Sequence, residues 1–95
     1  MRLPPRFDMT ITRADFRRLL PAAVNHVPFT EEKDAFVHEN GVRSWRIGFA
    51  PLPQLRIGLI RLERHHVGFE FTGYSAAEIE AFMVRFEMYF RRGGG

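Results

Sequence analysis

The sequence predicts an α+β fold: a two-layer sandwich in the order α-β-β-β-β-α, with a four-stranded antiparallel meander and both helices on one face of the sheet. Two amphipathic segments near the ends of the chain show the apolar spacing of helices. Between them, residues 36–72 alternate apolar and polar side chains and contain an Asn-Gly pair, which is typical of a β-hairpin. A single sheet covered on one side by two helices would bury all of these apolar stripes together.

The chain has 95 residues, which predicts a single α+β domain over residues 10–92. Residues 1–9 contain two adjacent prolines and predict a flexible N-terminal arm, and residues 93–95 form a glycine tail. The absence of cysteine excludes disulfides and thiolate metal sites. We find no apolar segment of the length that a signal peptide or a membrane span needs, and we expect a cytoplasmic protein that does not bind membranes.

The first helix is predicted to begin after Thr12, whose hydroxyl can cap it. Apolar residues then recur at helical spacing on one face, at Phe16, Leu19 and Leu20. Pro21 lacks a backbone N–H, so we expect the helix to end or kink near Leu20, with residues 22–24 as a broken extra turn.

The first hairpin is predicted at Asn40-Gly41, where a two-residue turn would pair Phe36 with Trp45 and His38 with Arg43. Residues 50–54 contain two prolines, which a central strand does not tolerate, so this segment is expected to be the second turn. A three-residue loop at 64–66 is the favoured third turn, and a two-residue loop is the alternative. These turns place one set of side chains on the core face: Phe36, Trp45, Ile47, Phe49, Leu55, Ile57, Leu59, Val67, Phe69 and Phe71.

The second helix is predicted to begin with a capping box formed by Ser75 and Glu78. Gly93 suits the position that ends such a helix. An alternative interpretation of the three glycines is a tail that is chemically activated at its carboxylate, as in ubiquitin-like carriers. A tail that directly follows a helix argues against it, because three residues reach only about 10 Å.

A candidate ligand site follows from the meander, because its first and third turns would lie at the same end of the sheet. This rim would combine three histidines with three arginines: His38, Arg43, Arg61, Arg64, His65 and His66. Protonated imidazoles and guanidinium groups favour an anion, and the arginines would repel a metal ion. We therefore expect no metal site and no cofactor. The alternative is a set of solvated turn residues.

The second face of the sheet is a candidate interface. It would carry the apolar residues Val37, Val42, Ile60 and Leu62, together with Arg46. Such a patch is typical of a surface that binds a protein partner or a second copy of the chain. A half-polar face in contact with water is the alternative.

The leading functional hypothesis is a small non-enzymatic protein-interaction or assembly module, with a homodimer as one form of it, that docks onto a protein partner through its open sheet face or its His/Arg rim. No catalytic motif or phosphate-binding loop is present in the sequence. The chain is basic, with a formal charge of +3 and arginines at positions 2, 6, 43, 46, 61 and 64, so nucleic-acid or polyanion binding is one alternative. A small metal- or anion-binding protein, or an enzyme, that uses the His/Arg rim is the other.

Overall fold

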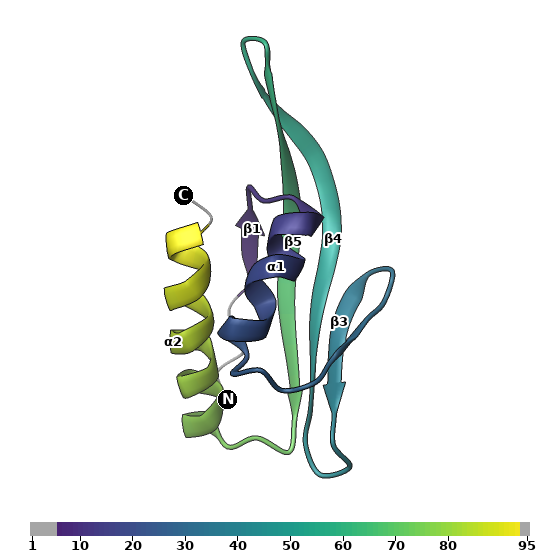
Figure 1. Ribbon diagram of the computed structural model, residues 1–95, viewed down its shortest axis with the longest axis vertical. Coiled ribbons are helices and arrows are strands. Elements are labelled where there is room, and N and C mark those ends of the chain that lie inside the picture. Colours follow the sequence, from purple (N-terminus) through teal and green to yellow (C-terminus); the bar gives the residue numbers. More distant parts are fainter. Residues whose placement is uncertain (1–5, 94–95) are drawn as a thin grey trace.

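Seven elements follow one another along the chain in a computed structural model that describes residues 6–93, and the side chains of residues 6–90. They are β1 (Phe7–Met9), α1 (Arg13–Ala23), β2 (Thr30–Glu31), β3 (Ala35–Glu39), β4 (Ser44–Ile57), β5 (Ile60–Thr72) and α2 (Ala76–Gly93). The strands form one antiparallel sheet in the order β1-β5-β4-β3-β2. Helices α1 and α2 contact each other on one side of it (Figure 1). The α+β class is confirmed, but the sheet has five strands where four were predicted.

Two strands that were not predicted, β1 and β2, are short and lie at the two edges. The total is five because the three strands predicted after Arg43 form only two, β4 and β5. β1 pairs Phe7 with Val67 and Met9 with His65, so part of the expected N-terminal arm is a strand. β2 pairs Thr30 with Val37. Residues 1–5 of the expected arm, and Gly94 and Gly95 of the expected tail, lie outside the described residues. Two- and three-residue strands carry too little alternation to be found from sequence.

Helix α1 begins as predicted, because the Thr12 hydroxyl accepts a hydrogen bond from the backbone N–H of Asp15 at 3.1 Å. It continues through Pro21 to Ala23. Pro21 lies in the last turn, where its missing N–H removes a single helical hydrogen bond. Two residues with positive φ, Asn25 and His26, then turn the chain toward β2.

The first hairpin has the predicted buried face but a shifted register. Phe36 pairs with Ile47, and His38 with Trp45, because Gly41 and Val42 form the turn instead of Asn40 and Gly41. The Asn40 side-chain oxygen accepts hydrogen bonds from the backbone N–H groups of Val42 and Arg43. Gly41 has a φ of +89°, which the first central position of this kind of turn favours. A shift of two residues leaves every side chain on its predicted face.

The second and third predicted turns do not form, because β4 and β5 make one long hairpin. Residues 50–54 belong to β4, where Pro51 pairs with His65, and residues 64–66 belong to β5. β3 pairs with β4 only as far as Gly48. Beyond that point one edge of β4 has no neighbouring strand among the described residues, and a proline on such an edge leaves no ladder hydrogen bond unmade.

The core lies between the helices and one face of the sheet. It is largely aromatic, and its buried members include Phe16, Leu20, Phe36, Trp45, Ile47, Phe49, Val67, Phe69, Met83, Phe86 and Phe90. The predicted core face is therefore confirmed for β3, for the first part of β4 and for the last part of β5. It is wrong for Leu55, Ile57 and Leu59, which are 40%, 58% and 102% exposed. No helix within residues 6–93 is long and apolar enough to cross a membrane.

Candidate functional site

The structure separates the residues of the predicted His/Arg rim. Arg43 follows the turn between β3 and β4, whereas Arg61 lies beside the turn between β4 and β5, at the opposite end of the hairpin. His38 is buried, and its Nδ1 lies 2.6 Å from the carbonyl oxygen of Pro28. These three side chains therefore do not form one site.

Adjacent positions on β5 place the other two histidines on opposite faces of the sheet. His65 is buried, with its Nδ1 2.8 Å from the carbonyl oxygen of Ile11. His66 faces the other way, and its Nδ1 lies 2.7 Å from a carboxylate oxygen of Asp8. The guanidinium group of Arg64 lies 3.9 Å from the second oxygen of Asp8. Of the rim, the structure brings together only Arg64 and His66, on either side of the Asp8 carboxylate.

No group of three or more histidine, cysteine, aspartate or glutamate side chains that could hold a metal ion occurs in the part of the chain that the structure describes. Three of the four histidines have a hydrogen-bond partner at Nδ1, and two of those partners are backbone carbonyl oxygens. These bonds supply each ring with a structural role.

The residues of the predicted interface lie in three places. Val37 is half-buried on β3, and Arg46 lies beside it, with ion pairs to Glu32 and Glu70. Val42 is 79% exposed in the turn between β3 and β4. Ile60 and Leu62 lie at the start of β5, far from the other three.

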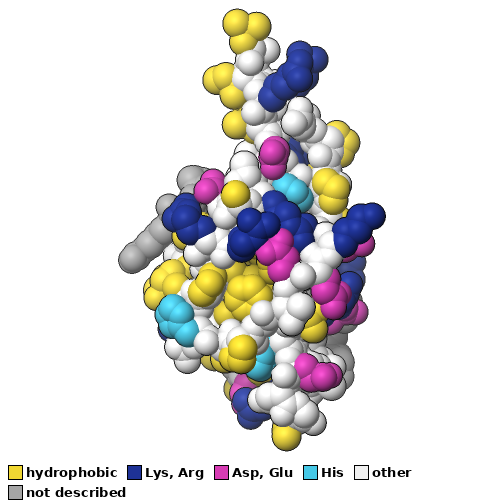
Figure 2. Space-filling view, turned by 45° about the vertical axis from the view of Figure 1, so that its right-hand side comes forward, with side chains coloured by type: hydrophobic (Ala, Val, Ile, Leu, Met, Phe, Trp, Pro, Cys, Tyr) yellow, Lys and Arg dark blue, Asp and Glu magenta, His cyan; other side chains and the backbone are white. Residues whose placement is uncertain are grey.

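That start of β5 is part of the most conspicuous surface feature, a two-stranded hairpin that extends beyond the helices and the other strands (Figure 1). We call residues 52–62 the projecting hairpin. It makes the molecule long, at 47 Å by 25 Å by 21 Å. Its end carries hydrophobic side chains next to a basic one (Figure 2). The exposed apolar residues are Leu55, Ile57, Leu59 and Ile60.

A β-bulge at the base of the projecting hairpin decides which way these side chains point. Leu52 pairs with Arg64, and the next pair is Leu55 with Leu62, so β4 advances by three residues while β5 advances by two. The extra residue on β4 moves every later side chain of that strand to the opposite face. Without it, Leu55 and Ile57 would continue the core-facing series that ends at Phe49.

Because of this bulge, the projecting hairpin has one aliphatic face and one basic face. Leu55 pairs with Leu62, and Ile57 with Ile60, so these four side chains share a face. Leu62 is an odd number of residues from the buried His65, which places this face on the side of the sheet away from the helices. Arg56 pairs directly with Arg61, and both lie on the other face.

Neither the aliphatic face nor the basic face stabilises a hairpin that is surrounded by water. A two-stranded ribbon without a covering layer is at best marginally stable. Directly opposed like charges such as Arg56 and Arg61 destabilise a strand pair by a few tenths of a kcal/mol or more. An aliphatic face left uncovered gains nothing from the hydrophobic effect. These features are typical of a segment that becomes stable against a partner.

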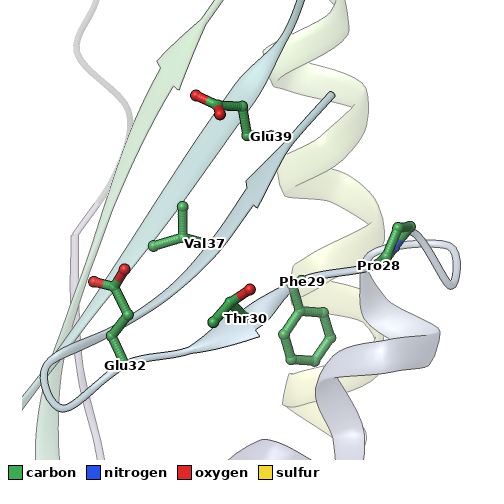
Figure 3. Close-up of a pocket in the computed structure, with 6 residues that line it drawn as sticks. All are labelled: Pro28, Phe29, Thr30, Glu32, Val37 and Glu39. Carbon is green, nitrogen blue, oxygen red and sulfur yellow. The ribbon is translucent and has the colours of Figure 1, made fainter. Parts of the chain in front are cut away.

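A second surface feature is a shallow groove of about 450 Å³ beside the β2–β3 pair. Its lining residues are Pro28, Phe29, Thr30, Glu32, Val37 and Glu39 (Figure 3). Pro28 and Val37 contribute apolar atoms to it, whereas the Phe29 ring packs against Phe36 and Trp45 on the core side. Its two charged residues are both acidic. Glu32 accepts a hydrogen bond from Arg46 at 3.0 Å. We refer to this feature as the β2–β3 groove.

Comparison of the chain with protein-family models, with curated proteins and with solved structures finds no match in any of the three. The function must therefore be argued from the residues and their arrangement.

Sequence reasoning missed the projecting hairpin, although a signal for it is present. The stretch 55–62 reads LRIGLIRL, in which aliphatic residues and arginines alternate symmetrically about Gly58 and Leu59. This symmetry predicts a hairpin with a two-residue turn. The two prolines at 51 and 53 gave a competing turn signal, which is valid only for a strand that is paired on both sides.

Proposed function

We propose that this protein is a small non-enzymatic interaction or assembly module that binds a protein partner through its projecting hairpin. The observation that carries the proposal is the β-bulge between Leu52 and Leu55. It gathers Leu55, Ile57, Ile60 and Leu62 on one face instead of dividing them between two. A continuous aliphatic surface at the end of a projection is a surface that a protein partner can cover.

The environments of the histidines support a binding role over a catalytic one. His38 and His65 are buried and hydrogen-bonded to backbone carbonyl oxygens. His66 is paired with Asp8. A general acid or base needs a proton-carrying atom that can reach a substrate, and the buried positions of the first two argue against that use.

Site-specific photo-cross-linking tests the proposal. A photoreactive amino acid at position 59, the fully exposed end of the hairpin, is expected to give a discrete protein adduct in cells. The same amino acid at position 84, which is 61% exposed on α2, serves as the matched control and should give little adduct. Equal labelling at both positions, or none at position 59, would contradict the proposal.

A second candidate function is binding of nucleic acid or another polyanion, which the Arg56–Arg61 pair favours. Two directly opposed guanidinium groups would be relieved of their repulsion by a phosphate between or beside them. Under this alternative, retention on heparin falls steeply as salt is raised, and replacing both arginines with alanine removes most of it. Weak retention that both proteins share would eliminate this candidate.

A further inference from the structure

We propose that the partner of the projecting hairpin is a second copy of this chain, and that each hairpin of the resulting dimer lies in the β2–β3 groove of the other copy. The inference rests on the proposed function and adds the identity of the partner. It follows from the composition of the two surfaces and from the direction in which the hairpin projects.

The two surfaces are complementary in polarity. The groove combines the apolar side chain of Val37 with the carboxylates of Glu32 and Glu39 (Figure 3). The hairpin combines an aliphatic face with the guanidinium groups of two arginines. Opposite charges at the edges of such an apolar contact steer association and select the partner.

The carboxylates of the groove are accessible to a partner. The Glu32 side chain is 50% exposed even though it is paired with Arg46. Glu39 is exposed at the end of β3, and it forms no ion pair with any residue that the structure describes. The arginines of the hairpin can reach past its edge, because a ribbon of two strands is only about 5 Å from strand to strand.

The hairpin cannot reach the groove of its own chain. Glu39 pairs with Ser44, at the first residue of β4, and the turn of the projecting hairpin follows Ile57, at its last. β4 has 14 residues, so these two ends are about 40 Å apart. Glu32, which lies level with Gly48, is still about 30 Å from the turn. An intact strand holds the turn at these distances. Only the groove of another molecule is therefore open to the hairpin.

A two-fold arrangement satisfies both surfaces at once. The hairpin of each copy would fill the groove of the other, and the same two surfaces would be used twice. A head-to-tail arrangement would use each contact once and leave a free hairpin at one end of an open chain. The reciprocal dimer is the arrangement that covers every hairpin.

Charge reversal in sedimentation equilibrium tests the inference. The unmodified protein is expected to be dimeric in the micromolar range. A hairpin variant with R56E and R61E, and a groove variant with E32R and E39R, should each dimerise about tenfold or more weakly, because like charges then meet in both contacts. Mixed in equal amounts, the two variants should form a heterodimer, since glutamates then meet arginines in both contacts.

Two further proteins complete the experiment. The variant I57S/I60S removes exposed aliphatic side chains and should be monomeric, whereas V84S, on the exposed face of α2, should dimerise normally. Circular dichroism verifies that each variant is folded. A monomeric unmodified protein, or two charge variants that do not rescue each other, would overturn the inference. If, in addition, position 59 cross-links only to a different protein, the inference fails while the proposed function stands.

Discussion

The imidazole ring of His65 stacks on the ring of Phe49, with 4.0 Å between the ring centroids and 15° between the ring planes. Its Nδ1 lies 2.8 Å from the carbonyl oxygen of Ile11. A carbonyl oxygen can only accept a hydrogen bond, so Nδ1 carries the hydrogen and donates it. His65 therefore joins β5, β4 and the segment before α1.

We predict that His65→Ala lowers the free energy of unfolding by about 2–3 kcal/mol, through loss of a buried hydrogen bond and an aromatic contact. Urea unfolding followed by the fluorescence of Trp45, the only tryptophan, measures this change. The matched control is His66→Ala on the opposite face, which should cost about 1 kcal/mol or less. Equal losses for the two variants would show that the stacked position of His65 contributes nothing.

Glu31 is predicted to make stability depend on pH. Hydrogen bonds from Arg17 and Arg13 lower the pKa of its carboxyl from 4.5 to about 2. Because the pKa in the folded protein lies below that of the unfolded chain, this contribution is complete above about pH 5. It is lost as the pH falls toward 2.

The variant Glu31→Gln isolates this effect. It should reduce the free energy of unfolding at pH 7 by about 1 kcal/mol, a value appropriate to a partly exposed ion pair. The difference from the unmodified protein should shrink steadily in urea titrations between pH 5 and pH 2. A difference that is the same at both ends of this range would contradict the assignment.

Gly73 is predicted to be intolerant of any side chain. Its φ is +79°, and a Cβ atom there would press against the backbone carbonyl oxygen of Val42. Gly73→Ala should cost about 2 kcal/mol or more in stability, from a strained backbone and a contact with atoms that cannot move aside. Gly58 is the control, because its φ of +60° is similar but its surroundings are open, and Gly58→Ala should cost about 1 kcal/mol. Equal melting temperatures for both variants would refute the steric argument.

The double variant Leu55→Ser/Leu62→Ser tests whether the aliphatic face of the projecting hairpin is the binding surface. The two side chains pair directly on this face, so the double variant removes half of its four aliphatic side chains. We expect the melting temperature of the protein to change little, because the projecting hairpin lies outside the core. Cross-linking from position 59 should decrease strongly. Unchanged cross-linking would show that the aliphatic face is not the contact.

The sequence predicted the elements in which local pattern and tertiary packing agree. The capping box of α2 is present as predicted, with hydrogen bonds from Glu78 N to Ser75 Oγ at 3.1 Å and from Ser75 N to Glu78 Oε1 at 2.9 Å. Trp45, Ile47 and Phe49 share the buried face. These features depend on residues within a few positions of one another, so a single sequence contains the necessary information.

The chain by itself determined the α+β class, both helices and the buried face of the central strands, because these follow from helical spacing and from alternation. Only the tertiary structure decided how far β4 and β5 run. Pro51 and Pro53 are compatible with a strand once β3 stops at Gly48 and leaves that edge of β4 free. The long pairing of β4 with β5 also separated the residues of the expected rim and left the aliphatic face of residues 52–62 exposed. The physical reason is that a strand's partners are distant in sequence, and one inserted residue in their register reverses every side chain beyond it.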